Sequence, residues 1–312
     1  MSNIKNQDKF IIRFEAFEKW YGKHHAIGPL DLNIRRGEIF ALLGPNGSGK
    51  STAIKALVGL HFPSKGRIVV NGFNVAEQSP ILKRMLSYIP QRVTMPGLMT
   101  AREILTLFAQ IKDMHPERVE EVLGLVSLQN DADRSIKEFS GGMVQRLGLA
   151  TVFLSEPELL VLDEPTLNLD PLGRETFRDL ILSLKEKGST VIMSSHIMQE
   201  AELLADRVGI LVDGKMVSVM QIPEFRESIS LETSMRIILL EGNKTIPIAA
   251  ENAGATFMNW EGNDMLFKAP PNRRLDILRA IENSGGVIRE FHSDPPDWDM
   301  LLKKQFNANR EN

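Results

Sequence analysis

Short, continuous apolar runs alternate with segments of helical period over residues 10–91 and 155–221. The apolar runs are typical of strands that are buried on both faces, and the segments between them repeat apolar residues at helical spacing. Strands that alternate with helices indicate βαβ units and a largely parallel sheet, so we predict an α/β fold here. The stretch Arg13–Phe17 alternates polar and apolar residues instead. It predicts an antiparallel strand near a sheet edge.

Two further segments have patterns of their own. From about Thr100 to Ala150, apolar residues recur at helical spacing and predict a helical subdomain, preceded by a Pro96-Gly97 turn or hinge. After Pro223, the predicted order β-α-β-β-α-β is that of a ferredoxin-like fold. Its expected elements are the strand Ser234–Glu241, the helix Ile246–Asn252, the strands Ala255–Trp260 and Met265–Lys268, the helix Pro271–Asn283, the strand Val287–Phe291 and a short helix ending near Phe306. We therefore expect an N-terminal domain over 10–225, with its helical subdomain at about 92–152, and an accessory domain over 231–312.

Composition narrows the class of protein. A hydrophobic content of 43% with 25% charged residues is ordinary for a soluble globular protein. A net charge of -3 gives no support for nucleic acid as the main partner. No apolar stretch reaches transmembrane length, the N-terminus lacks a signal-peptide core, and there is no cysteine. We expect a cytoplasmic protein, with contact to a membrane left open.

The segment Gly44-Pro45-Asn46-Gly47-Ser48-Gly49-Lys50-Ser51 has the pattern of a phosphate-binding P-loop. Its glycines let consecutive backbone N–H groups turn toward a phosphate, Lys50 can reach the β- and γ-phosphates, and Ser51 can ligate Mg²⁺. A helical pattern starts at Thr52, so a helix N-terminus faces the same anion. The alternative is a glycine-rich turn that fits the pattern by chance. Because the segment lies between a strand and a helix, we predict that the chain binds a nucleoside triphosphate.

Two acidic residues follow a second apolar strand, Leu159–Leu162. Asp163 lies at the carboxyl end of this strand, where open α/β sheets bind their ligands, and is a candidate Mg²⁺ ligand. Glu164 is a candidate general base for the attacking water. The alternative is a buried strand followed by a charged loop, which the P-loop elsewhere in the chain argues against.

The segment Phe139-Ser140-Gly141-Gly142-Met143 opens a strongly helical stretch and is a second candidate anion site. In order after the P-loop and before the acidic strand, it resembles the signature motif of ATP-binding subunits of ABC transporters. It departs from that motif at Phe139, where Leu is usual, and at Met143, where Gln is frequent. The resemblance implies a P-loop NTPase (RecA-like) core with an antiparallel edge sheet and a helical subdomain.

The resemblance also implies roles for further residues. Tyr21 is similar to the aromatic residue that stacks on adenine, with Trp20 as the expected core residue beside it. Gln91 resembles the glutamine that joins the Mg²⁺ site to the helical subdomain, and His196 the histidine that contacts the γ-phosphate. The segment Thr166–Asp170 resembles the D-loop, with Asn168 where a smaller residue is common. The other histidines (His24, His25, His61, His115 and His292) are expected to be surface or loop residues without a role.

In this family the site is shared between two copies: Ser140, Gly141 and Gly142 of one copy would cover the ATP that the P-loop of the other copy binds. The resemblance therefore implies an ATPase that uses ATP and Mg²⁺, dimerises with itself and drives a separately encoded permease at the inner face of the membrane, more often in export. Within the family, the segments around Gln91 and Ser140 are similar to subunits that serve copper-site maturation of nitrous oxide reductase. The alternatives are a soluble ATPase of this type acting on DNA or ribosomes, and a small-molecule kinase.

Overall fold

The computed structural model describes residues 9–77, 80–167, 169–230, 233–241, 245–261 and 264–294. The chain divides into two compact units between Met220 and Gln221. The helix expected near Phe306 and the D-loop residue Asn168 lie outside the described residues.

A six-stranded sheet forms the centre of the first unit, in the order β10-β9-β3-β8-β7-β6. The pairs β9–β3, β3–β8, β8–β7 and β7–β6 are parallel, as the apolar runs predict. Asp213 and Gly214, both with positive φ, make the tight turn between β9 and β10. The strands are β3 (Ile39–Leu43), β6 (Leu86–Ile89), β7 (Leu159–Asp163), β8 (Thr190–Ser195), β9 (Arg207–Val212) and β10 (Lys215–Gln221).

A second sheet of the first unit is antiparallel, in the order β2-β1-β4-β5. Its strands are β1 (Phe10–Tyr21), β2 (His24–Arg35), β4 (Lys65–Val70) and β5 (Phe73–Asn74), followed by the 3-10 turn η1 (Val75–Glu77). The prediction that Arg13–Phe17 forms an antiparallel strand near a sheet edge is confirmed, because β1 is antiparallel to both neighbours and lies next to the edge strand β2. β1 is not itself the edge, since β4 pairs with its other side.

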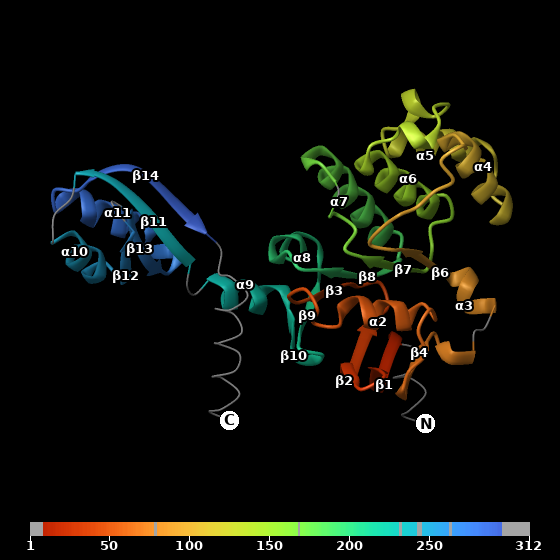
Figure 1. Ribbon diagram of the computed structural model, residues 1–312, viewed down its shortest axis with the longest axis horizontal. Coiled ribbons are helices and arrows are strands. Elements are labelled where there is room, and N and C mark those ends of the chain that lie inside the picture. Colours follow the sequence, from red (N-terminus) through yellow and green to blue (C-terminus); the bar gives the residue numbers. More distant parts are fainter. Residues whose placement is uncertain are drawn as a thin grey trace. The chain divides into compact units, whose positions relative to one another are not determined.

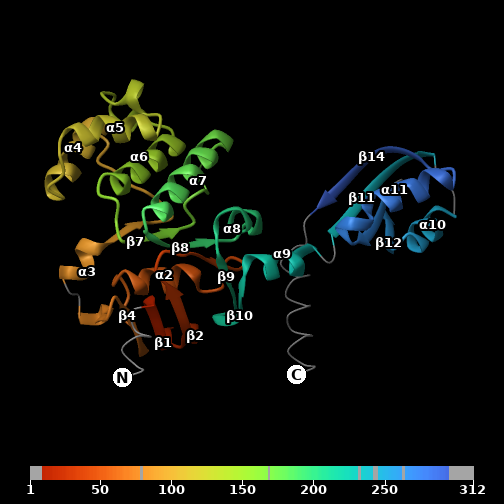
Figure 2. The same ribbon diagram turned by 180° about the vertical axis from the view of Figure 1, so that it is seen from behind.

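Three of the helices in the first unit lie together. Both views show α4, α5 and α6 together at one end of the unit, with β1, β2 and β4 at the opposite end (Figure 1, Figure 2). Local signals place the helix ends: Thr100 and Glu103 form a capping box on α4, and Asp170 caps α7 ahead of a proline. The helical elements are α2 (Lys50–Leu57), α3 (Pro80–Met85), α4 (Ala101–Ile111), α5 (Glu117–Leu125), η2 (Gln129–Asp131), η3 (Ile136–Glu138), α6 (Gly141–Phe153), α7 (Pro171–Glu186) and α8 (Met198–Leu204).

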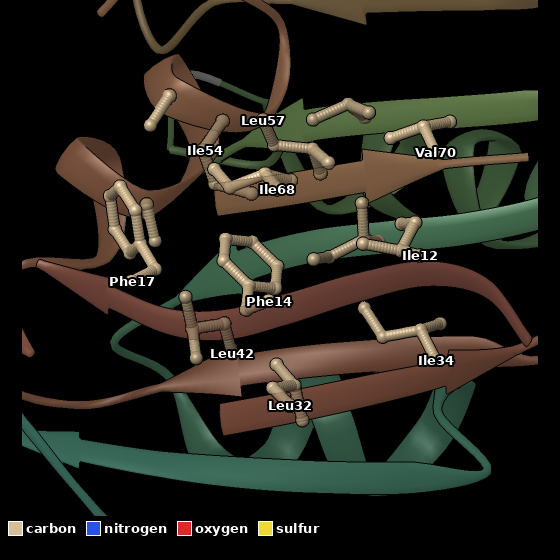
Figure 3. Packing of buried hydrophobic residues seen from close by; sticks show 14 of the residues in the cluster. Ile12, Phe14, Phe17, Leu32, Ile34, Leu42, Ile54, Leu57, Ile68 and Val70 are labelled. Carbon is tan, nitrogen blue, oxygen red and sulfur yellow. The ribbon is translucent and has the colours of Figure 1, made fainter. Parts of the chain in front are cut away.

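A hydrophobic core joins the two sheets of this unit across α2. Figure 3 shows Phe14 of β1, Leu42 of β3, Ile54 of α2 and Ile68 of β4 packed against one another. All four are at most 2% exposed. Because α2 continues directly from the P-loop, this core fixes the loop between the two sheets.

The second unit contains one antiparallel sheet in the order β12-β13-β11-β14, with α10 and α11 contributing to its core. This strand order with a β-α-β-β-α-β sequence is ferredoxin-like, which confirms the predicted fold. Its buried residues include Met235, Ile237, Phe267 and Ile281. The elements are α9 (Ile222–Ser230), β11 (Thr233–Glu241), α10 (Ile246–Asn252), β12 (Thr256–Glu261), β13 (Asp264–Ala269), η4 (Pro271–Arg273), α11 (Arg274–Asn283) and β14 (Val287–Asp294).

Candidate nucleotide-binding site

The P-loop leads from the fully buried strand β3 into α2. Lys50 is 4% exposed, and its Nζ donates to the carbonyl oxygens of Gly44 (2.8 Å) and Pro45 (3.0 Å). Burial lowers the pKa of Lys50, and the carboxylates of Glu164 and Asp163 oppose that effect. A buried cation held by two carbonyls is poised to exchange them for phosphate oxygens.

Two glycines, Gly49 and Gly214, lie where the P-loop meets the neighbouring segments. Gly49 has φ +102°, and a Cβ there would lie 2.8 Å from the carbonyl oxygen of Ala26. The turn at Gly214 supports the same loop, because its N–H donates to the carbonyl oxygen of Ser48 (3.1 Å). Its own carbonyl accepts from the N–H of Gly28 (2.7 Å). The P-loop backbone is therefore held by both β2 and the β9–β10 turn.

Asp163 lies at the end of β7 and is 1% exposed. Its Oδ1 accepts hydrogen bonds from the hydroxyls of Ser51 (2.9 Å) and Ser194 (2.7 Å). Its Oδ2 is buried and has no hydrogen-bond partner among the residues that the structure describes. A carboxylate and a hydroxyl in contact, with one carboxylate oxygen left over, are hard oxygen ligands of the kind that Mg²⁺ prefers. The residues present thus fit a Mg²⁺ site.

Glu164 is 7% exposed and has φ 47°, which is unusual for a residue other than glycine. Its N–H donates to Ser194 Oγ (3.0 Å), so one hydroxyl links the backbone of Glu164 to the carboxylate of Asp163. Its Oε2 lies 3.1 Å from His196 Nδ1 and 3.5 Å from Gln91 Nε2, and its Oε1 lies 3.8 Å from Lys50 Nζ. The structure therefore brings together the residues for which the sequence predicts catalytic and Mg²⁺-binding roles.

A cavity of about 400 Å³ opens above the P-loop. Its described lining contains Tyr21, His24, Ala26, Asn46, Gly47, Ser48, Gly49, Lys50, Ser51, Thr52, Gln91 and Glu164. The sequence indicated no role for His24 or for Ala26. Both residues reach the cavity because the β1–β2 hairpin pairs Tyr21 with His24. No motif signals this placement, which depends on the register of the hairpin.

Tyr21 lines this cavity and is 43% exposed. Its hydroxyl hydrogen bonds to His61 Nδ1 at 2.6 Å, so His61, for which the sequence indicated no role, orients the ring. Burial, followed by the charges of Lys55 and Lys19, lowers the pKa of His61. The expectation that Trp20 is a core residue is wrong: it is 39% exposed and its ring stacks on that of His25, with centroids 4.2 Å apart.

The signature segment Ser140–Gly142 lies outside the P-loop cavity. Ser140 caps α6 by accepting a hydrogen bond from the N–H of Met143 (3.3 Å) and is exposed. A Cβ at Gly141 would meet nothing within 4 Å. Among the described residues, those that line the P-loop cavity do not include Ser140, Gly141 or Gly142. The chain alone does not bring its two predicted anion sites together.

The segment between Gln91 and Thr100 combines exposed and packed residues. Leu98 is 88% exposed. Val93 lies against Gly148 of α6, where an added Cβ would be 2.8 Å from the Val93 side chain. Met99 is half-buried, and its carbonyl accepts from the N–H of Ile136 (2.9 Å). Val93 and Met99 therefore pack within the unit, and the apolar side chain of Leu98 is directed to solvent.

Comparison with known proteins identifies the family. The ABC transporter family model matches residues 27–167. Over 212 residues the chain is 42% identical to the bacitracin transport ATP-binding protein BcrA of Bacillus licheniformis, covering 66% of this chain and 68% of that protein. The chain belongs to the ABC transporter family. It is an ATP-binding subunit that hydrolyses ATP for transport, so the resemblance inferred from the motifs is confirmed at this level.

Two further relatives of this ABC subunit extend the comparison. The Nod factor export ATP-binding protein I of Cupriavidus metallidurans is 29% identical over 300 residues, which cover 94% of this chain and 96% of that protein. An ATP-binding cassette solved as a dimer in a post-hydrolysis state with ADP and Pi matches 68% of this chain and 98% of its own, with a TM-score of 0.63 and 25% identity. Among the described residues of the ABC subunit, none of the helices has the length and apolar character needed to span a membrane.

Proposed function

We propose that two copies of this chain close around two ATP molecules and that each site is completed by the signature segment of the other copy. The observation that carries this proposal is the position of Ser140–Gly142, which do not line the P-loop cavity of their own chain; Ser140 and Gly141 are exposed and Gly142 is half-buried. An exposed helix N-terminus with open space at Gly141 can accept the phosphates of a nucleotide held by a second copy. The dimeric relative with ADP and Pi supports this arrangement.

Within each site, we assign roles by the family resemblance together with the contacts above. Tyr21 stacks on the adenine, and the segment Gly44–Thr52 with Lys50 binds the phosphates. Ser51, Asp163 and Gln91 hold Mg²⁺, which neutralises charge on the phosphates when bound. Glu164 accepts the proton of the attacking water, and His196 contacts the γ-phosphate and orients Glu164 through the 3.1 Å contact.

The proposed partner outside the dimer is a separately encoded membrane permease, which would hold the subunit at the inner face of the membrane. The names of the relatives, which refer to bacitracin transport and Nod factor export, support transport and favour export. They name no process on DNA or ribosomes. The narrower resemblance to copper-site maturation subunits gains no support from these relatives and stays a prediction. The residues 10–225 and 231–312 are the proposed functional domains.

Complementation between two inactive variants tests the shared site. Ser140→Arg should block the signature segment, and Glu164→Gln should remove the base, so each variant alone should be inactive. A mixed dimer contains one site with both an intact Glu164 and an intact Ser140. We expect the mixture to regain ATPase activity. Each mixed dimer should reach up to about half the activity of a wild-type dimer if the two sites act separately. Absence of any recovery, with mixed dimers verified by two affinity tags, would contradict the proposal.

A further inference from the structure

A buried hydrogen bond joins the signature helix to the turn that carries Glu164. Gln145 lies in α6, and its Nε2 donates to the carbonyl oxygen of Pro165 over 3.0 Å. Gln145 is 2% exposed. At a buried position, removal of the amide would leave the Pro165 carbonyl without a partner, which costs more than the bond itself contributes.

The backbone of this turn is otherwise held by the core of the unit. The N–H of Glu164 donates to Ser194 on β8, and the carbonyl of Glu164 accepts from Leu167 within the turn (3.3 Å). The hydroxyl of Thr166 hydrogen bonds to Glu200 on α8. Gln145 therefore brings a contact from the helical group α4–α6 to the backbone of a turn that also bonds to β8 and α8.

The same helix carries the exposed signature segment. Ser140 caps α6, and Gln145 follows five residues later on the continuous helix Gly141–Phe153. Ser140 and Gln145 are separated by about 7–8 Å along the helix axis at 1.5 Å per residue. Because an α-helix moves as a rigid element over this length, a displacement at Ser140 reaches the carbonyl of Pro165 through Gln145.

We propose that Gln145 is a positioning residue. Through its bond to the carbonyl of Pro165, the position of the turn that carries Glu164 depends on the position of α6. The ATP covered by Ser140 of one chain would then bias the base of that same chain, which acts at the opposite site of the dimer. Gln145 thus couples the two sites. This inference rests on the proposed two-copy arrangement.

The neighbouring residue provides a matched control. Arg146 is also on α6, and its guanidinium donates to the carbonyls of Val126 (3.2 Å) and Ser127 (3.1 Å), inside the helical group. Arg146→Met removes side-chain bonds to carbonyls from the same helix without touching the turn of Glu164. Gln145→Met keeps roughly the length and volume of the side chain and removes the amide, including the Nε2 donor that bonds to Pro165.

The first measurement is steady-state ATPase activity of the homodimers. Gln145→Met should lower kcat about tenfold or more, with KM for ATP changed less than about threefold, because the lost contact acts on the base rather than on nucleotide binding. Arg146→Met should lower the melting temperature without this selective loss of kcat. An unchanged kcat in Gln145→Met, or an equal fall of kcat in both variants, would overturn the proposal.

The second measurement separates the two chains of a dimer. In a mixed dimer in which one chain carries Glu164→Gln, single-turnover phosphate release comes from the chain with the intact Glu164. Placing Gln145→Met in that chain should slow release about tenfold, whereas placing it in the Glu164→Gln chain should leave the rate within about twofold. Equal slowing from either chain would indicate a role of Gln145 in general stability. Slowing only when Gln145→Met is in the Glu164→Gln chain would indicate a role in the signature segment. Either result would refute the coupling role.

Failure of the underlying arrangement has a different result. If mixed dimers of wild-type and Glu164→Gln chains do not form with ATP, or if a monomeric chain hydrolyses ATP at the wild-type rate, the two-copy arrangement is refuted and the inference with it. If the mixed dimers form and release phosphate normally but show no dependence on which chain carries Gln145→Met, only the role of Gln145 is refuted.

Discussion

Ser194 is the residue whose removal gives the most direct test of how the base and the Mg²⁺ ligand are held. Its hydroxyl is fully buried, donates to Asp163 Oδ1 over 2.7 Å and accepts from the N–H of Glu164 over 3.0 Å. Ser194→Ala removes both bonds and changes the volume by a single oxygen atom. It leaves the N–H of Glu164 without a partner at a residue with positive φ.

The expected cost follows from these two bonds. A hydrogen bond to a carboxylate contributes about 1.5–3 kcal/mol, and a buried N–H without a partner costs about 1–3 kcal/mol. Because the two effects share one hydroxyl and do not add fully, we expect a loss of about 2–4 kcal/mol in the free energy of unfolding. For a unit of this size, that is a fall of about 5–15 °C in the melting temperature of the nucleotide-free protein.

Ser48 provides the matched control, because its hydroxyl is also buried but has no hydrogen-bond partner among the described residues. Ser48→Ala should therefore leave the melting temperature of the nucleotide-free protein within about 2 °C of wild type. Scanning calorimetry without nucleotide measures both variants. A cost for Ser48→Ala as large as that for Ser194→Ala, or no cost for Ser194→Ala, would refute this account of the site.

Four other substitutions test three separate parts of the protein. Glu164→Gln should abolish turnover while ATP binding by equilibrium dialysis remains; near-wild-type ATPase activity would contradict its assignment as the base. Lys50→Ala should weaken ATP binding about tenfold or more in the same assay, because it removes a charge-assisted contact to the phosphates; unchanged affinity would contradict that role. Leu98→Glu should reduce association with membranes containing the permease and leave the melting temperature unchanged, because Leu98 is exposed. Met99→Glu should lower the melting temperature, because Met99 is half-buried. Equal effects of the two substitutions would contradict the assignment of Leu98 to docking and Met99 to packing.

The sequence predicted those parts of the molecule that depend on local pattern. The P-loop, Asp163 and Glu164 follow buried strands whose continuous apolar residues are visible in the sequence, so both the sheet and the edge at which these residues meet could be predicted. The strand order of the second unit followed from the order of its elements. These features need only periodicity and the ends of strands.

Other contacts depend on pairings between distant segments and left no local signal. Ser194 reads as one more residue of an apolar strand, yet it joins Asp163 to Glu164. His24 lines the cavity because of a hairpin register, and His61 contacts Tyr21 from a distant loop. Trp20 was expected in the core because large aromatic residues usually are, but its stacking on His25 leaves it at the surface.

The β9–β10 turn has a consequence for how variants of this gene would be interpreted. Gly214 has φ +75°, and a Cβ there would lie 3.0 Å from the carbonyl oxygen of Ala26. A genetic screen for loss of transport should therefore recover substitutions at Gly214 beside those in the P-loop, although Gly214 lies outside the nucleotide-binding motifs. Gly214 is buried, and its N–H donates to the carbonyl of Ser48, so we expect such substitutions to displace the P-loop and weaken nucleotide binding.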